Sequence, residues 1–115
     1  MIVSHLESLE NSSVSHDPDV SKRVLLKNGD LPNITQFAQA ILKPGQISSM
    51  HCHQDMSEVF FVQSGVAEME VDSTLIPLSP GSSVTVRPKE KHEIRNTGNE
   101  DLVLLYFGVL DNSRE

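Results

Sequence analysis

The 115-residue sequence contains only one cysteine, Cys52, and no long hydrophobic run. A single cysteine excludes an internal disulfide, so the chain is not a small secreted scaffold braced by disulfide bonds. The longest apolar run, LVLLYFGVL near the C-terminus, is far shorter than the roughly 20 apolar residues that span a bilayer. The N-terminus, MIVSHLESLENSS, lacks the basic start and apolar stretch of a signal peptide. These absences predict a cytoplasmic protein that does not bind membranes.

Positive charge is also scarce. The chain has 9 Lys and Arg against 16 Asp and Glu, which gives a formal net charge of −7. A negative field of this kind repels phosphate backbones, and no Lys/Arg cluster is interleaved with aromatic residues. We therefore expect no nucleic-acid partner. The length is typical of one compact domain that can bury a core without disulfides.

Short strand-like segments separated by turn residues make up most of the sequence. Several alternate apolar and polar residues with period two, and they end at turn formers such as Pro44-Gly45. The predicted strands are KRVLLKN, ITQFAQAILK, EVFFVQ, VAEMEV, STLIPL, SVTVRP, HEIRN and LVLLYFGVL. Their spacing is typical of a β-sandwich or barrel. We expect an N-terminal extension over residues 1–20, a barrel domain over 21–111 and a C-terminal tail over 112–115.

The segment HCHQDMSE contains two of the five histidines, His51 and His53, and ends at Glu58. Residues two apart on a strand point to the same side, so both imidazoles would face one space. Glu58 is an odd number of residues from both, so QDMS must bend the chain; a following antiparallel strand would then return Glu58 to that space. His92, which begins HEIRN, is the predicted fourth member. An H-x-H pair alone is more often an ordinary surface or core pair, but the addition of Glu58 and His92 favours a metal site.

The donor set limits the choice of metal. Imidazole nitrogens with one carboxylate suit divalent first-row metals better than calcium or magnesium, which prefer all-oxygen sites. Four protein ligands fill a tetrahedral zinc site, whereas a six-coordinate ion keeps two positions open for substrate, water or dioxygen. We therefore predict one Fe, Mn, Ni or Co ion, with Zn or Cu as alternatives.

These residues resemble the two sequence motifs of the cupin family, and the resemblance covers roughly residues 22–110. The first motif matches at Gly45, His51, His53, Glu58 and Gly65, and the second matches at Gly81, His92 and Asn96. One departure lies in the second motif, where Arg87 takes the place of the usual proline and Lys89 that of the usual glycine. The departure concerns the shape of this turn and not the predicted ligand His92.

The resemblance implies an all-β jelly roll, a double-stranded β-helix barrel, with the metal inside near one end and frequent dimers. In the family the metal is typically held by three histidines and one glutamate, which correspond here to His51, His53, Glu58 and His92. Cupins include dioxygenases, sugar-phosphate isomerases, epimerases, decarboxylases, lyases and non-catalytic binding proteins. The fold therefore does not select a reaction.

Strand periodicity predicts which other side chains share the metal's side. Phe60 and Val62 lie on the face of Glu58, and Ile94 lies on the face of His92. Tyr106 would reach either the pocket mouth or an interface.

On ITQFAQAIL two opposite faces could point inward. One would place the Gln39 amide in the pocket, and the other would place Ala38, Ala40 and Leu42 there. Cys52 is expected to face away from the metal. The resulting pocket would be mostly apolar, with no Lys or Arg aimed inward.

Three functions remain open. The first is a metal-dependent enzyme of the dioxygenase type that acts on a small, weakly polar, chelating organic molecule, with Glu58 as catalytic base. The alternatives are a non-catalytic binding or sensing module and a metal-dependent isomerase or lyase. Because LVLLYFGVL is apolar on both faces, we also expect a homodimer that covers the outer one.

Overall fold

Ten strands and one short 3-10 helix make up the computed structural model, which describes residues 1–14 and 17–111. The elements are η1 (Leu6–Ser8), β1 (Ser12–Val14), β2 (Asp17–Leu26), β3 (Ile34–Leu42), β4 (Ile47–His51), β5 (Met56–Ser64), β6 (Ala67–Val71), β7 (Thr74–Leu78), β8 (Ser83–Val86), β9 (His92–Asn96) and β10 (Leu102–Leu110). Every segment predicted as a strand overlaps an observed strand. The predicted tail over 112–115 lies outside the described residues.

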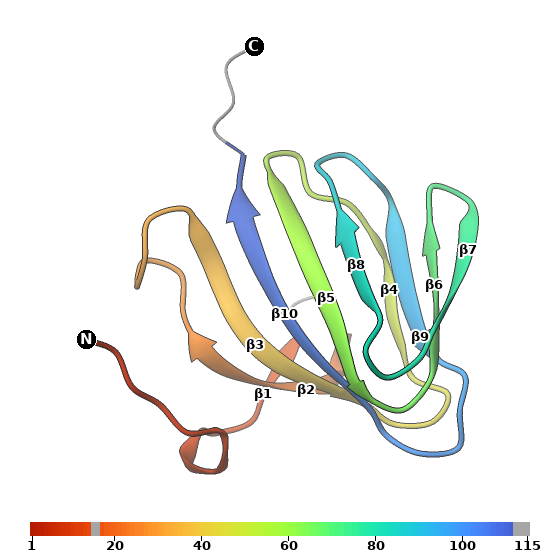
Figure 1. Ribbon diagram of the computed structural model, residues 1–115, viewed down its shortest axis with the longest axis horizontal. Coiled ribbons are helices and arrows are strands. Elements are labelled where there is room, and N and C mark those ends of the chain that lie inside the picture. Colours follow the sequence, from red (N-terminus) through yellow and green to blue (C-terminus); the bar gives the residue numbers. More distant parts are fainter. Residues whose placement is uncertain (15–16, 112–115) are drawn as a thin grey trace.

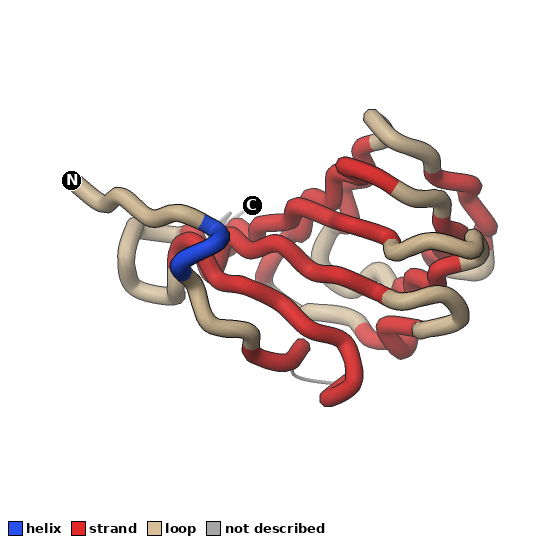
Figure 2. The backbone as a smooth tube through the Cα atoms, turned by 90° about the horizontal axis from the view of Figure 1, so that it is seen from below, coloured by secondary structure: helices blue, strands red, loops and turns tan. Residues whose placement is uncertain are grey.

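The strands form two antiparallel sheets that face each other. One sheet has the order β1-β2-β3-β10-β5-β8, and the other has the order β4-β9-β6-β7. Figure 1 shows the larger sheet on the left and centre of the view and the smaller one on the right, and Figure 2 shows them from below. The predicted all-β jelly-roll class is confirmed.

The core lies between the sheets and follows the period-two alternation of the strands. On β10, Leu102 and Leu104 are both buried, and their neighbours along the strand are less so. Leu102 is paired with Leu42 of β3, and Leu104 is paired with Val62 of β5. Strands of the larger sheet therefore stack apolar side chains on one inner face, as sheet packing requires.

The N-terminal segment joins the larger sheet. β2 begins at Asp17, and Val20 on this strand is 1% exposed. β1 pairs antiparallel with β2 and extends the sheet by one more strand. The predicted boundary between residues 20 and 21 thus falls inside β2. This stretch is polar and contains Pro18, so its sequence did not indicate a strand.

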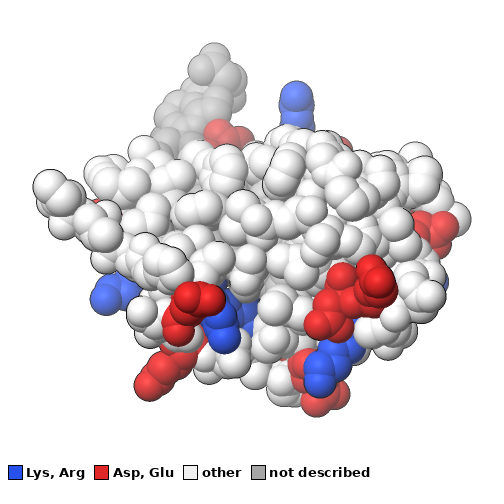
Figure 3. All heavy atoms as spheres, turned by 60° about the horizontal axis from the view of Figure 1, so that its bottom comes forward, with Lys and Arg blue, Asp and Glu red and all other residues white. Residues whose placement is uncertain are grey.

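Acidic and basic side chains are mixed on the surface. Figure 3 shows them interleaved along the lower edge of one face, most of which is neutral. In the described part of the chain, no helix is long and apolar enough to cross a bilayer.

Candidate metal centre

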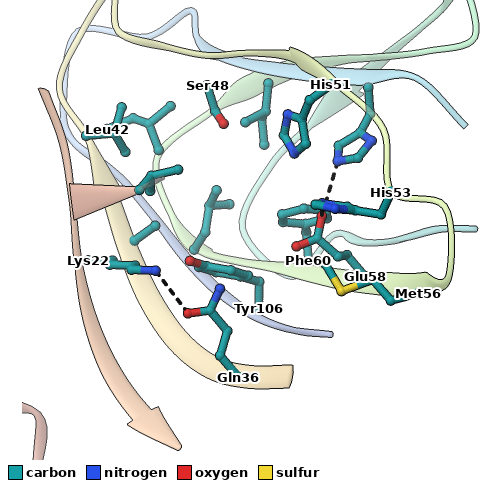
Figure 4. Close-up of a pocket in the computed structure, with 16 residues that line it drawn as sticks. Lys22, Gln36, Leu42, Ser48, His51, His53, Met56, Glu58, Phe60 and Tyr106 are labelled. Carbon is teal, nitrogen blue, oxygen red and sulfur yellow. Dashed lines mark hydrogen bonds and ion pairs between the residues drawn. The ribbon is translucent and has the colours of Figure 1, made fainter. Parts of the chain in front are cut away.

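The four predicted metal ligands lie together inside one end of the barrel. Their donor atoms are all within 4.8 Å of one another. His51 ends β4, His53 lies in the loop that follows, Glu58 is on β5, and His92 begins β9. Figure 4 shows the side chains of His51, His53 and Glu58 converging on one side of a pocket. These four residues could hold a metal ion.

The strands position these side chains differently from the sequence-based expectation. β4 pairs with β9, with His51 directly opposite His92, whereas β5 pairs with β10 and β8 in the other sheet. The predicted return of an antiparallel strand beside β4 is therefore wrong: residues 52–55 carry the chain from one sheet to the other. His53 also lies beyond the end of β4, so period-two alternation does not orient it.

Backbone carbonyls set the tautomers of two imidazoles. His51 Nδ1 lies 2.7 Å from the Ser49 carbonyl oxygen, and His92 Nδ1 lies 3.1 Å from the Glu90 carbonyl oxygen. A carbonyl only accepts, so each Nδ1 must be the protonated donor. In neutral imidazoles the lone pair is then on Nε2, the nitrogen that a metal would bind. This hydrogen bond from the second ring nitrogen is typical of metal-ligating histidines.

The facing atoms of His53, His92 and Glu58 suit a shared cation. Glu58 Oε1 lies 3.1 Å from His53 Nε2 and 3.2 Å from His92 Nε2. With its Nδ1 proton donated to a carbonyl, neutral His92 would point a lone pair at a carboxylate. Within the described residues, His53 Nε2 is also buried without a hydrogen bond. A proton or a metal ion between these atoms would resolve both conflicts, so the residues fit a divalent metal.

The pKa values of the metal-free pair reflect this arrangement. Burial alone would raise the pKa of Glu58, but the hydrogen bond to His92 and the charges of the three imidazoles outweigh burial and lower it. Burial likewise opposes a charge on His92, yet hydrogen bonds to Glu58 and to the Glu90 carbonyl raise its pKa. Without metal, a proton held between His92 and Glu58 takes the place of the cation.

The turn that departs from the second cupin motif contains a residue with positive φ. Lys89 has a φ of 71°, the left-handed conformation that glycine adopts most readily. Its backbone N–H donates to the His53 carbonyl over 2.6 Å. The turn thus holds the loop that carries His53, although a lysine occupies the position. A lysine in this conformation carries local backbone strain.

Asp17 braces the strand that carries His51. Its two carboxylate oxygens accept hydrogen bonds from the Ser49 backbone N–H, at 2.8 Å, and from the Ser49 hydroxyl, at 2.6 Å. The Ser49 carbonyl in turn accepts from His51 Nδ1. A residue in the predicted extension therefore links the larger sheet to a metal ligand. Sequence spacing contained no signal for this contact, which joins distant segments.

A cavity of about 130 Å³ adjoins the ligands. Three of the predicted pocket residues, Phe60, Ile94 and Tyr106, line it. The rings of Phe60 and Tyr106 stack at a centroid distance of 5.7 Å. Val62 does not line the cavity; it is 1% exposed and packs deeper in the core.

The prediction that Gln39 lies in the pocket is wrong. Its amide donates to Gln63 on the outer face of the larger sheet, over 2.8 Å. Ala38, Ala40 and Leu42 occupy the inner face of β3 instead. Both faces of this strand carry apolar residues, so the alternation alone did not identify the inner one.

Three polar pocket residues were not predicted: Lys22 on β2, Gln36 on β3 and Ser48 on β4. Lys22 Nζ donates to Gln36 Oε1 over 3.1 Å, and Figure 4 shows both side chains at the end of the pocket away from the histidines. The expectation that no lysine points into the pocket is wrong. Lys22 lies two residues from Val20 and from Val24, so period-two alternation places it on the same face of β2 as these apolar residues.

Comparison with known proteins places this architecture in a family. Residues 38–108 match the cupin domain model. An oxalate-binding protein of Thermotoga maritima is 30% identical over 74 residues, which is 64% of this chain and 61% of that protein. A glucose-6-phosphate isomerase of Pyrococcus abyssi is 33% identical over 92 residues, covering 69% of this chain and 47% of the isomerase. The chain thus spans about half the length of that enzyme.

A solved structure has the same fold over nearly the whole chain. This crystal structure from Thermotoga maritima, of a protein described as a "predicted oxalate decarboxylase", has a TM-score of 0.88. The match covers 95% of this chain and 99% of that protein, at 24% identity. With both motif segments inside the matched region and the same barrel, this chain belongs to the cupin family.

Proposed function

We propose that this cupin is a metal-dependent enzyme that transforms a small, chelating organic molecule. The observation that carries the proposal is the arrangement of Glu58 Oε1 against two imidazole nitrogens at 3.1 and 3.2 Å. A proton or a metal ion between these atoms would relieve the contact between the lone pair of neutral His92 and the Glu58 carboxylate. The three-histidine, one-carboxylate donor set favours a divalent Fe, Mn, Ni or Co ion, with Zn or Cu as alternatives.

The metal would supply Lewis-acid chemistry and a template for a chelating ligand. The chain's own residues supply the surroundings of that ligand. Apolar side chains such as Phe60 and Ile94 line the cavity and limit the access of water. Glu58 has a lowered pKa, so it is ionised at neutral pH and can accept a proton from the ligand. We assign it the role of catalytic base in addition to that of ligand.

The reaction class that we favour is oxygenation. A metal held by His51, His53, Glu58 and His92 would supply Lewis-acid chemistry to the ligand, and the apolar side chains that line the cavity suit dioxygen. The test is oxygen uptake by protein loaded with Fe or Mn, over a panel of small 2-hydroxy acids, 2-oxo acids and diketones. Uptake with product formation would support the assignment. Turnover without oxygen would replace it with an isomerase or lyase reaction.

The names of the relatives favour small oxygen-rich ligands in general. One relative is named for oxalate and another for a sugar phosphate. The cavity volume of about 130 Å³ is below the range of roughly 300–1,000 Å³ typical of drug-sized ligands. A ligand closer in size to oxalate than to a sugar phosphate suits such a space.

A non-catalytic binding or sensing cupin is the second candidate. It is favoured by the cavity lining, which contains one acidic residue, Glu58, among the described residues. Thermal unfolding with and without chelator distinguishes the two in part. A metal present at about 100 times its Kd stabilises the fold by about 2.7 kcal/mol, or roughly 10 to 20 °C for a chain of this size. That shift without turnover of any ligand in the panel would favour the binding module.

We also propose that the protein is a homodimer. The side chain of Phe61 on β5 is 41% exposed on the outer face of the larger sheet. Val59 and the outer residues of β10, Val103, Leu105 and Phe107, extend this face as partly exposed side chains. An apolar stripe of this kind is typical of an interface.

A further inference from the structure

Lys22 and Gln36 form a polar end of the cavity, on the side away from the metal ligands (Figure 4). They come from the paired strands β2 and β3. Lys22 Nζ donates to Gln36 Oε1 over 3.1 Å in a partly buried contact. Apolar side chains, including Leu42, Leu104 and Val20, line the cavity with them. Burying an ammonium group at such an apolar surface costs free energy unless a counter-ion or a bound ligand compensates its charge.

The protein partner of Lys22 is neutral. An ammonium has three donors, and the Gln36 amide oxygen accepts from one of them. Among residues 1–14 and 17–111, no carboxylate forms an ion pair with Lys22. Burial lowers the pKa of Lys22, and the charge of Glu58 partly opposes this effect. The positive charge is thus held at the cavity wall without a neighbouring counter-ion.

Tyr106 adds a second donor at the same end. Figure 4 shows its hydroxyl directed toward the side of the cavity where Lys22 and Gln36 lie. Burial and the charge of Glu58 raise the pKa of Tyr106 to about 12. The hydroxyl therefore stays protonated and can donate a hydrogen bond. An ammonium, a phenol and the amide NH₂ of Gln36 form a set of donors suited to an oxyanion.

We propose that Lys22, together with Gln36 and Tyr106, is the anion-binding end of the pocket and accepts the carboxylate of a small organic acid. The acid's other oxygen atoms would face His51, His53, Glu58 and His92. This inference rests on the proposed function, since the metal centre provides the second anchor. It also corrects the weakly polar ligand expected from the sequence, because one end of the ligand carries a negative charge.

A carboxylate suits this end better than a phosphate. Lys22 is the one Lys or Arg among the described residues that line the cavity, and its single charge matches a carboxylate. A phosphate dianion would need more convergent cations. The volume of about 130 Å³ is below the roughly 300–1,000 Å³ of typical ligand pockets, which suits a short acid better than a phosphorylated sugar.

The test measures binding of acids that share a chelating group but differ in charge at the far end. L-malate is compared with its 4-amide, and hydroxymalonate with its monoamide, by calorimetry on protein loaded with Co²⁺ to a measured content. We expect the wild type to bind each acid about tenfold or more tightly than its amide. K22M should abolish this preference. K43M is the matched control, because Lys43 is exposed at the end of β3, and it should keep the preference.

Q36E is a second variant, in which a carboxylate placed beside Lys22 competes with the ligand. It should also lose the preference, and thermal unfolding would establish that both variants are folded. An unchanged preference in K22M, or none in the wild type, overturns the inference and leaves the proposed function intact. Inorganic phosphate that binds more tightly than both acids, and depends on Lys22, would overturn the carboxylate assignment.

Failure of the proposed function would be recognised separately. If the protein takes up no Co²⁺, Fe²⁺, Mn²⁺ or Ni²⁺, the metal centre is wrong. The same acid and amide pairs are then titrated into the metal-free protein. A preference for the acid that K22M removes would still support the anion-binding end, and the absence of any preference would overturn it.

Discussion

His51 and His92 are paired directly across β4 and β9, with ring centroids 4.3 Å apart. Paired residues of neighbouring antiparallel strands hold their side chains within about 5.5 Å, so the register of the smaller sheet sets the spacing of two ligands. Glu58 belongs to the larger sheet. The site is therefore complete only when the two sheets pack against each other, and a bound metal would tie them together.

Removal of one of these imidazoles should abolish tight metal binding. For H92A we expect metal affinity to fall by about 100-fold or more, because this loss should exceed the 10–100-fold cost of changing a supporting residue. H5A, an exposed histidine outside the site, is the matched control. Competition against a fluorescent chelator measures both. An H92A affinity equal to that of H5A would exclude His92 as a ligand.

Asp17 should influence metal affinity without contacting the metal. D17A removes two hydrogen bonds to Ser49 and with them the support of the carbonyl that orients His51. We expect affinity to fall by about tenfold and unfolding free energy by about 1–3 kcal/mol. D19A, at an exposed position on the same strand, is the control. Lower stability with unchanged metal affinity would limit Asp17 to a structural role.

Lys89 should be replaceable by glycine with a gain in stability. The left-handed conformation at φ 71° costs a non-glycine residue about 1–2 kcal/mol, and the greater flexibility of unfolded glycine offsets roughly 0.5–1 kcal/mol. K89G should therefore stabilise the protein by up to about 1 kcal/mol in urea unfolding. K27G, at a position without positive φ, should destabilise it. If K89G loses as much stability as K27G, the left-handed conformation of Lys89 is not strained.

The metal-free protein should be most stable at mildly acid pH. Glu58 has a lowered folded pKa, so its contribution is present above the unfolded value of 4.5 and is lost as pH falls through the folded value. His92 has a raised folded pKa, so its contribution is present below the unfolded value of 6.5 and is lost as pH rises through the folded value.

Both contributions are complete between pH 4.5 and pH 6.5. E58Q should flatten this dependence, which urea unfolding at a series of pH values measures. Above pH 6.5 metal affinity should change in the opposite sense to stability, because loss of the His92 proton removes its stabilising contribution but frees the imidazole for a metal, so that binding strengthens as pH rises. A wild-type profile that parallels that of E58Q would show that the pair does not couple to folding.

The apolar outer face of the larger sheet should hold the dimer together. F61D places a charge at the centre of the face proposed as the interface and should produce monomers in light scattering, because an unpaired buried charge is strongly disfavoured. L75D is the matched control, since Leu75 is 57% exposed on the smaller sheet. A wild type that is monomeric in dilute solution, or an F61D variant that stays dimeric, would contradict the proposed interface.

Metal ligands and strands could be predicted from the sequence because their signals are local. Period-two alternation and turn residues identify strands one at a time, and the spacing from Gly45 to Glu58 is itself a motif. The side chains that line the pocket were harder to predict. Gln39 and Gln36 lie on the same strand, and only contacts with β2 and β10 decide which amide faces inward.

The contacts that the N-terminal segment makes with the rest of the barrel were not predictable for a related reason. Asp17 reaches Ser49, 32 residues further along the chain, and no pattern near either residue indicates that contact. Val20 is buried among residues of other strands, although the segment around it is polar.

The order of residues alone specified the all-β class, the two family motifs and, through those motifs, the four residues that could hold a metal ion, since each motif depends on spacing within a short segment. Tertiary structure decided the rest. It placed Glu58 on the sheet opposite His51 and His92, because β5 forms its hydrogen bonds with β10 and β8 rather than with β4. It also turned Lys22 into the pocket. Pairing between distant strands selects which face of each strand is buried, and that choice determines the ligand that the pocket can accept.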